Sequence, residues 1–543
     1  MKTPIDYFKH EMEYLKKQQA QFAKEHPDIA ARLYLGTADA DPFVEKIIQA
    51  TAFLTGRIQK KLDHQYENIS KQLLETTTAF LTRPIPSQLL LRFQPLASLN
   101  KMVFLEKHTE VIVGHNERHF IFQTDEAFPI VPLKISYTQI IKKNILSICV
   151  EKISEKAIFQ KEEIFQIHAS ISLEYSQAAL LYFCLQSNET PFQLSFDENL
   201  TNTLDEKIDI RRMPSPRIDS AESLLIQFHH FPESFFRFQF NLPASIFKNY
   251  SKIYLWKSHD TELELFHNDM NNKAILLNCI RCTNDFTRSA DPISIRNMQL
   301  NYPLSALEKN PVEIIEIQNV AIRNTHSKEK IPTQAFLQNT QNMDRPIYWN
   351  LSREEKNYIT LEDPHRRVDW QSSYSLNAEL LCSDGAATSR LRYQPEKLDW
   401  KLAKNTEDYF SEIKPASIPT LFCAPSIKEN DYSNLFFILQ SARSSLFHSE
   451  NALAIFKSYL GALDHSGNSY WKLLRENMAA LHCSIARILD EGELVSGIEV
   501  VLTWSKNTKI ARHELFLFEH ILETVFDYLK PINTKIKFYA VSN

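Results

Sequence analysis

Two cysteines, Cys279 and Cys282, are separated by two residues. This spacing occurs in halves of zinc sites and in redox-active pairs. A zinc site needs a second pair of ligands, and the chain has none at a workable spacing. A thioredoxin-like helix does not follow the motif either. We therefore expect both residues to be buried or half-buried strand cysteines without a metal or redox role.

Four histidines stand in pairs that could bind a metal ion. His115 and His119 would share one face of a helix, which would bring two imidazoles within reach of one ion. Gly114 and the short extended segments on both sides favour a hairpin tip instead. The adjacent pair His229 and His230 is interpreted as structural.

Paired carboxylates could serve as a general acid and a general base. The candidates are Asp39 with Asp41, and Glu354 with Glu355. Both pairs are expected in loops or at helix starts, where capping explains them without acid–base chemistry.

Nucleophilic catalysis has no recognisable motif in this chain. Cys483 directly follows His482, but neighbours in sequence do not make a nucleophile–base pair. The Gly-x-Ser-x-Gly elbow of hydrolases is absent. The chain has only eight glycines, no two of them two residues apart, so it contains neither the dinucleotide fingerprint nor the phosphate-binding loop. We expect no catalytic residue, cofactor or metal, and hence a protein that is not an enzyme.

The composition is that of a large globular chain. Its 543 residues exceed what one hydrophobic core organises, which predicts roughly three or four domains. A net charge of -5 gives no general attraction to nucleic acid or to anionic membranes. Seven cysteines, an odd number, fit reduced thiols. The sequence lacks a signal core and a long apolar run, so we expect a cytoplasmic protein without direct membrane insertion.

The N-terminal region has the clearest helical periodicity. Apolar residues at positions 8, 12, 15 and 22 line one helix, which should end before Pro27. A second helix is predicted from an N-cap at Asp41 to about Asp63, and a third over residues 69–80. The stripe of the second helix comprises Val44, Ile47, Ile48, Thr51, Leu54, Ile58 and Leu62.

These three helices predict a helical bundle of one of two kinds. The bundle is either intramolecular or shared between subunits. The second helix is about 33 Å long, roughly twice the average for globular proteins. A helix of that length can extend beyond one small core and pack against a partner, so both kinds remain open.

From residue 88 onward the period changes to two, as is typical of β-strands. Segments between 101 and 123 predict short strands, with a hairpin tip over 114–118. The polar residues 199–220 predict a linker or exposed turn. The phenylalanine-rich stretch 224–240 predicts a core strand pair, with a subunit interface as the alternative.

The C-terminal part returns to helical periodicity. Helices are predicted over 434–444, 451–463 and 470–482, and then a strand over 497–503. A last helix should end before Pro531. Its apolar face includes Phe518, Leu522 and Phe526.

Together these patterns predict an α+β multidomain fold. It has an N-terminal helical bundle, β-rich middle domains and an α+β C-terminal domain. The predicted domains are 1–87, 88–215, 216–425 and 426–543.

The N-terminal residues also carry a family resemblance. The order runs Glu11-x-x-Tyr14-Leu15, Phe22-Ala23-x-x-His26-Pro27-x-Ile29-Ala30-x-Arg32-Leu33, Asp41-Pro42-x-Val44-Glu45, Ala52-Phe53-Leu54-x-x-Arg57-Ile58-x-x-Lys61-Leu62-Asp63 and Arg83-Pro84-Ile85-Pro86-Ser87. Over some eighty residues it resembles the opening of the TssF family, also called ImpG or VasA.

Three later stretches resemble family signatures, and two of them have one departure each. Residues 228–238 resemble the central aromatic signature. In the stretch 277–286, Asp285 stands where the family usually has an apolar residue. In the C-terminal signature, Lys535 occupies a position that is usually aromatic. The resemblance thus covers nearly the whole chain.

Members of this family are baseplate subunits of bacterial type VI secretion systems. The resemblance implies a non-enzymatic structural subunit of the baseplate wedge, two copies of which pair with one TssG-type subunit. It also implies TssE- and TssK-type subunits and the spike as partners. The baseplate would dock at the inner membrane complex and provide the platform for assembly of the tail tube and sheath.

Six apolar residues are the predicted packing or interface positions. They are Leu54, Ile58 and Leu62 of the second helix and Phe518, Leu522 and Phe526 of the last helix. Two alternative functions stay open. One is a metal-dependent hydrolase built from the scattered His and Cys residues, and the other is a component of a phage-tail-like baseplate.

Overall fold

Helices and antiparallel sheets alternate along the chain, and the α+β multidomain fold is confirmed. The chain divides into two compact units, one of Met1–Thr82 with Ser426–Ser444 and one of Arg83–Pro425 with Ser445–Asn543. The computed structural model describes residues 4–32, 42–115, 118–142, 144–155, 164–186, 191–201, 203–208, 210–213, 220–259, 274–295, 301–336, 346–353, 357–364, 373–403, 409–425, 432–464, 469–490, 493–506 and 510–542.

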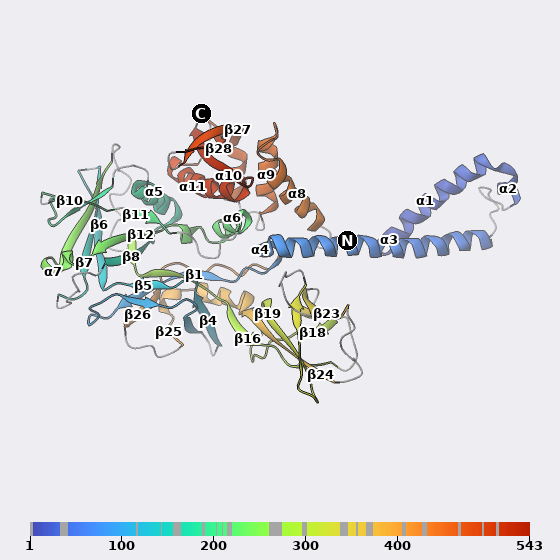
Figure 1. Ribbon diagram of the computed structural model, residues 1–543, viewed down its shortest axis with the longest axis horizontal. Helices are drawn as coiled ribbons and strands as arrows, with labels where there is room; N and C mark the ends of the chain where they lie inside the picture. Colours follow the sequence, from blue (N-terminus) through green and yellow to red (C-terminus); the bar gives the residue numbers. More distant parts are fainter. Residues whose placement is uncertain are drawn as a thin grey trace. The chain divides into compact units, whose positions relative to one another are not determined.

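The first unit is helical (Figure 1). Three of its helices start with proline, whose missing amide hydrogen is not needed in the first turn. Each of these three also has an acidic residue in its first turn, where it complements the helix dipole. The helices of the unit are α1 (Pro4–Glu25), α2 (Pro27–Arg32), α3 (Pro42–Thr77), α4 (Ala79–Thr82) and most of α8 (Tyr432–Ser445).

The α3 helix is continuous over 36 residues, about 54 Å. The sequence predicts two helices with a break after Asp63, and that break is wrong. The intramolecular bundle of three separate helices is wrong with it, while a bundle shared between subunits stays a prediction. Residues 64–68 are polar and interrupt the apolar pattern, but they include neither glycine nor proline, and nothing there ends the helix. The predicted N-cap Asp41 lies outside the described residues.

α1 and α3 form a helical hairpin (Figure 1). Gly56 of α3 allows the backbones to approach closely, because a Cβ atom there would lie 3.2 Å from the backbone of Tyr7 and Phe8. Ala52, one turn earlier, is fully buried. The Tyr7 hydroxyl donates a 2.8 Å hydrogen bond to Asp63 Oδ2. Small residues therefore set the spacing of the hairpin.

The second unit contains a six-stranded sheet that curls around its own core. Its terminal strands β25 and β26 contact each other, and its inward side chains form one apolar cluster that includes Phe93, Phe122 and Trp400. The predicted hairpin tip is confirmed, since His115 pairs with Arg118 across it. The strand order is β25 (Trp400–Leu402), β3 (Glu110–His115), β4 (Arg118–Thr124), β15 (Cys279–Thr283), β1 (Gln88–Pro95) and β26 (Phe410–Pro415).

Two further sheets and a short strand pair belong to the same unit. The predicted linker 199–220 is wrong in its first part, because β10 and β11 lie there, while residues 214–219 lie outside the described residues. The first sheet is β10 (Thr203–Ile208), β9 (Phe192–Ser195), β13 (Lys252–Ser258), β7 (Ile145–Lys152) and β6 (Leu133–Ile141). The second is β11 (Ile210–Arg212), β12 (Arg237–Pro243), β8 (Ile164–Ile171) and β14 (Ile275–Leu277), and β2 (Val103–Leu105) pairs with β5 (Phe128–Ile130).

The phenylalanine-rich stretch is only partly a strand, so the predicted strand pair is wrong. It begins as helix α6 (Ala221–His230), continues as the 3-10 turn η1 (Pro232–Phe235) and ends in β12. Ser220 and Ser223 form a capping box that starts α6. Residues 221–228 are all buried, and a helix buried on every side shows no period by which sequence could reveal it. The other helices of this region are α5 (Tyr175–Gln186) and α7 (Ile246–Asn249).

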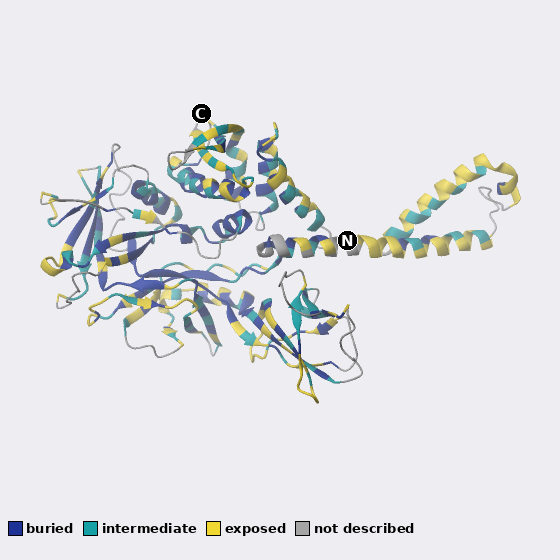
Figure 2. Ribbon diagram, viewed as in Figure 1, coloured by how far each residue is buried: buried dark blue, intermediate teal, exposed yellow. Residues whose placement is uncertain are grey.

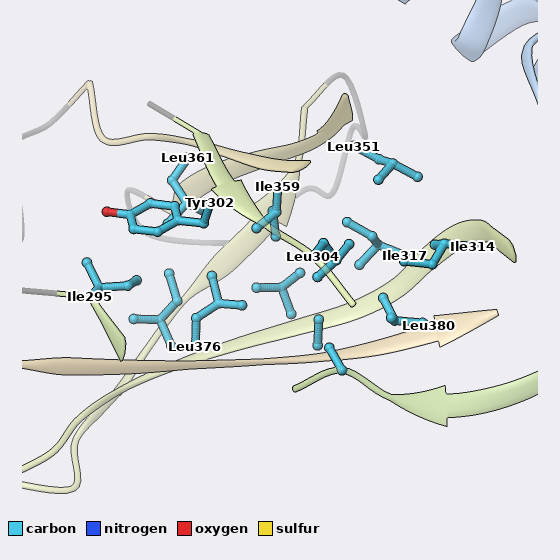
Figure 3. Packing of buried hydrophobic residues seen from close by; sticks show 14 of the residues in the cluster. Ile295, Tyr302, Leu304, Ile314, Ile317, Leu351, Ile359, Leu361, Leu376 and Leu380 are labelled. Atoms are coloured by element: carbon cyan, nitrogen blue, oxygen red, sulfur yellow. The ribbon is translucent and has the colours of Figure 1, made fainter. Parts of the chain in front are cut away.

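A five-stranded sheet and a four-stranded sheet share the apolar core of a β-sandwich (Figure 3). Figure 3 shows Ile295 and Leu376 from one sheet near Tyr302 and Ile359 from the other. The first sheet is β16 (Phe286–Ser289), β24 (Tyr374–Ser383), β19 (Glu313–Asn324) and β20 (Lys330–Ile331), with β17 (Ile293–Ile295) on β24. The second is β18 (Asn301–Pro303), β23 (Asn357–Glu362), β22 (Ile347–Arg353) and β21 (Thr333–Ala335), and the 3-10 turns η3 (Gly385–Arg392) and η4 (Pro395–Lys397) follow β24.

The C-terminal segment combines helices with a three-stranded sheet. The predicted helix 470–482 is too long, because it ends at Asn477 and a strand begins at Met478. Pairing along nearly the whole of the next strand overrides the helix propensity of these residues. The elements are α9 (Ala452–Ala462), α10 (Ser469–Asn477), β27 (Met478–Asp490), β28 (Glu493–Trp504), α11 (Arg512–Leu529) and β29 (Lys535–Ser542).

The boundaries of the four predicted domains stay a prediction. The six-stranded sheet takes strands from two of the predicted segments, and the first compact unit adds Ser426–Ser444 to the N-terminal helices. Among the helices that the structure describes, none has the length and apolarity to span a bilayer.

Replacement of Gly56 by leucine should loosen the α1–α3 hairpin. The new side chain has no space against the α1 backbone, and overpacking of this kind costs about 1–3 kcal/mol. Trypsin should then cleave α1 faster than in the wild type. Gln59→Leu, which places the same side chain at an exposed position of α3, is the control. Equal cleavage rates for both variants would contradict the close-packing account.

Candidate functional site

The outstanding surface feature of the described residues is an apolar stripe along α3. Its five members are between 55% (Ile69) and 66% (Ile47) exposed. Figure 2 shows the exposed residues continuing along this helix. We call this set the α3 stripe: Ile47, Leu54, Ile58, Leu62 and Ile69.

The α3 stripe lies on a different side of the helix from the one that packs against α1. At about 100° per residue, Ala52 and Gly56 point roughly 140° away from the centre of the stripe. These two residues are buried, whereas the stripe residues Leu54 and Ile58 are about 60% exposed. Burying one such side chain contributes about 1.5–3 kcal/mol, and exposed apolar patches of this kind mark interaction sites.

One rim of the stripe is basic. Lys46, Arg57 and Lys61 are exposed and follow the same edge of the stripe. The acidic residues Glu45 and Asp63 point toward the α1 side instead. Asp63 accepts the hydrogen bond from Tyr7. The surface therefore combines an apolar centre with a positive border.

The six predicted packing or interface residues divide into two groups. Leu54, Ile58 and Leu62 are exposed members of the stripe, and their part in partner contacts stays a prediction. The other three belong to the core of the second unit. They are Phe518, Leu522 and Phe526, each at most 1% exposed.

The buried face of α11 anchors the C-terminal sheet. The Phe526 ring lies 5.4 Å from that of Phe538 on β29, and Phe518 lies 5.9 Å from Phe228 on α6. The buried carboxylate of Glu519 accepts a 2.8 Å hydrogen bond from Trp504 Nε1 and also pairs with Arg512. These contacts fix α11 between α6 and the sheet.

A buried ion pair joins three elements of the second unit. Arg281 Nε on β15 lies 2.5 Å from Asp125 Oδ2, and both side chains are at most 1% exposed. Thr283 Oγ1 donates to the other carboxylate oxygen at 2.8 Å, and Arg281 Nη1 donates to Gln227 Oε1 on α6 at 2.9 Å. Sequence reasoning missed this pair, since its members are 156 residues apart.

A second polar cluster lies where the six-stranded sheet meets the β-sandwich. Asn284 Nδ2 donates to Asp384 Oδ2 at 2.8 Å, and Arg118 Nη2 lies 2.8 Å from Asp384 Oδ1. Asn284 Oδ1 accepts from the Ser383 hydroxyl at 2.7 Å. The neighbouring Asp285, where the family pattern has an apolar residue, is buried. The other departure, Lys535, is exposed and pairs with Gly497 at the start of β29.

The cysteines of the candidate metal or redox motif are buried in strand β15, which confirms their predicted place. Burial raises the pKa of the Cys279 thiol to about 12 and that of the Cys282 thiol well above its usual value. A thiolate is the form that binds metal or attacks a disulfide, so both residues are inert at neutral pH. All seven cysteines are free.

The histidine candidates are also held in structural roles. His229 lies 3.7 Å from Asp464, and the His230 ring contacts the Thr420 hydroxyl at 2.9 Å. Burial lowers the pKa of His230 to about 4, so it is neutral at physiological pH. Within the part of the chain that is described, no three His, Cys, Asp or Glu residues form a possible metal site.

The remaining candidate catalytic residues, where the structure describes them, do not form a catalytic site. His482 and Cys483 are consecutive residues of β27, so their side chains point to opposite faces of the sheet. Burial raises the pKa of Cys483 to about 11. Asp39, Glu354 and Glu355 lie outside the described residues.

Comparison with solved structures identifies the fold. A chain of a cryo-electron microscopy structure, the type VI secretion system TssK-TssF-TssG baseplate subcomplex, matches with a TM-score of 0.72 and 16% identity, covering 92% of this chain and 96% of that one. A chain of the baseplate complex from the type VI secretion system matches with a TM-score of 0.59 and 15% identity, covering 99% and 97%. The fold is that of chains found in such baseplates.

Sequence comparison gives the family. The family model "Type VI secretion system, TssF" matches residues 1–209 and 213–542, and the chain belongs to this family. A curated relative is type VI secretion system component TssF1 of Pseudomonas aeruginosa strain PAO1. It is 37% identical over 92 residues, which are 17% of this chain and 15% of that protein.

The thiols of β15 should resist alkylation in the folded protein. Their raised pKa leaves almost no thiolate at pH 8, and burial excludes the reagent. Iodoacetamide followed by peptide mass spectrometry should label Cys279 and Cys282 only after unfolding in urea. Rapid labelling of the native protein would show that the motif is accessible and reactive.

Loss of one partner of the buried ion pair should destabilise the second unit strongly. Asp125→Ala leaves the Arg281 charge buried without its partner, which costs about 3–5 kcal/mol. The double variant Asp125→Ala with Arg281→Met removes the unpaired buried charge and should recover part of the lost stability. Urea unfolding gives the free energy of unfolding of the single and the double variant. Additive losses in the double variant would mean that the two charges are not coupled.

Proposed function

We propose that this chain is a structural subunit of a type VI secretion baseplate wedge, and that it joins a TssG-type subunit through the α3 stripe. The observation that carries the proposal is a continuous exposed apolar face on the longest helix of a TssF-family chain. An isolated hairpin with such a face is incomplete, and partner helices would bury it.

The two parts of the chain have different tasks in this proposal. Unit 1 provides the apolar helix face that drives association by removing side chains from water. Unit 2 provides a rigid frame, because its sheets enclose continuous apolar cores and the buried charges of Arg281 and Asp125 are paired. Assembly of this kind needs no catalytic group, and the role is non-enzymatic.

Further partners belong to the proposal on the strength of the family and of the solved neighbours. One neighbour is a complex that contains a TssK chain, which favours a TssK-type partner here. A second copy in the wedge, a TssE-type subunit and the spike complete the expected set. The assembled platform would support tail tube and sheath assembly on the cytoplasmic side of an inner membrane complex.

Ile58→Asp should abolish the complex with the TssG-type subunit while leaving the chain folded, because Ile58 is exposed in the chain alone. In the complex, the carboxylate introduced at position 58 would lose its hydration in the interface, at a cost of several kcal/mol. Co-expression, affinity purification and mass measurement of the complex test this. The control is Gln59→Asp, which makes the same change in charge one position further along α3.

Two results distinguish a wrong interface from a wrong function. A complex of normal mass with the Ile58→Asp variant would remove the stripe from the interface. A wild-type chain that ignores the TssG-type subunit would contradict the proposed function itself.

A further inference from the structure

The C-terminal sheet of the second unit ends in a long strand with one strand neighbour. β29 pairs in parallel with β28 over its eight residues, and the register has no bulge. Among the described strands, none pairs with the opposite edge of β29, which we call the open edge. The strand at the other end of the sheet, β27, has a bulge near its start and contacts α9 and α10. An uninterrupted edge presents a row of backbone amide and carbonyl groups to which a further strand can pair.

The apolar side of this sheet is complete only as far as β28. On the side that faces α11, four residues of β28 are at most 4% exposed: Ile498, Val500, Leu502 and Trp504. Their neighbours on β29 are Ile536, Phe538 and Ala540, and all three are only half-buried. A further strand along the open edge would cover these side chains in the way that β29 covers those of β28.

The opposite side of β29 combines charge with apolar surface. Lys535 and Lys537 are exposed at alternate positions, and Tyr539 (37% exposed) and Val541 (47% exposed) continue the row. The Lys537 ammonium lies 5.2 Å from the centre of the Tyr539 ring. Glu499 pairs with Lys537 in the register of β28 and offsets part of the positive charge. The first half of the row is therefore basic and the second half apolar.

The charges of β29 indicate what kind of strand fits the open edge. Residues 535–542 contain two lysines and no acidic residue. In a pair of two β29 strands, no register would place a carboxylate opposite a lysine. Opposite charges on facing strands stabilise the pair, and like charges destabilise it. Another copy of β29 therefore leaves the lysines uncompensated, whereas a strand with acidic side chains compensates them.

We propose that the open edge of β29 binds an extended segment of another protein as a fourth strand, with acidic side chains opposite Lys535 and Lys537. Backbone hydrogen bonds along the edge supply affinity, and the two lysines select the acidic segment. The site lies in the second unit and does not involve the α3 stripe. The proposal therefore stands or falls independently of the partner that covers α3.

A designed peptide tests the proposal on the full-length chain. The probe is a fluorescein-labelled peptide of four Glu-Val repeats, which as a strand has all its glutamates on one face and all its valines on the other. Fluorescence anisotropy should show that it binds at least about tenfold more tightly than a peptide of four Lys-Val repeats. Higher salt should weaken the binding.

Charge reversal on β29 locates the binding site. Lys535→Glu with Lys537→Glu should weaken binding of the Glu-Val peptide by about tenfold or more, and the two Lys→Gln changes should weaken it less. Circular dichroism should be unchanged, because both side chains are exposed. The control, Lys328→Glu with Lys330→Glu, makes the same change in charge at exposed positions of the β-sandwich and should bind normally. In the wild type, the peptide should slow hydrogen exchange of residues 535–542.

Three results would overturn the proposal. Absence of binding up to about 1 mM peptide would remove strand addition. Equal binding of the Glu-Val and Lys-Val peptides would remove the acidic partner. Binding without slower exchange of residues 535–542 would place the peptide on a different surface. A wild-type dimer that protects these residues without any peptide would assign the open edge to a second copy of the chain, and this too would contradict the proposal.

Discussion

A two-helix hairpin can bury only one side of each helix, and this constraint explains the first unit. Ala52 and Gly56 occupy the side of α3 that faces α1, and they are small enough to let the two backbones approach closely. The larger apolar residues lie on another side and remain in contact with water. A third helix within the predicted bundle would have covered them. Since α3 is a single helix, these residues stay exposed in the chain alone, and we propose that another chain covers them.

The second unit meets the opposite condition, because its apolar residues are enclosed by its own sheets. The curled six-stranded sheet and the β-sandwich each surround a continuous cluster. The buried charge of Arg281 is compensated by Asp125 and Gln227. An ordered frame of this kind transmits force without rearrangement, which suits a subunit that holds other proteins in place.

Local periodicity predicted much of this structure, and non-local contacts account for the rest. The hairpin tip at 114–118, the strand cysteines and the last helix follow from patterns that persist over several residues. The continuity of α3 could not be predicted, because five polar residues interrupt its apolar pattern. Helix α6 could not be predicted either, because a fully buried helix has no apolar periodicity. It placed Leu54, Ile58 and Leu62 on one apolar face. It could not show that they are exposed, since core and interface residues look alike in sequence.

Hydrogen–deuterium exchange on the full chain, alone and with the TssG-type subunit, tests the central claim most directly. If partner helices cover the α3 stripe, amides of residues 47–69 should exchange more slowly in the complex, since covered helices open less often. The sandwich strands β19 and β24 should exchange at the same rate in both states. Unchanged exchange over 47–69, with protection elsewhere in the chain, would show that the complex forms through a different surface.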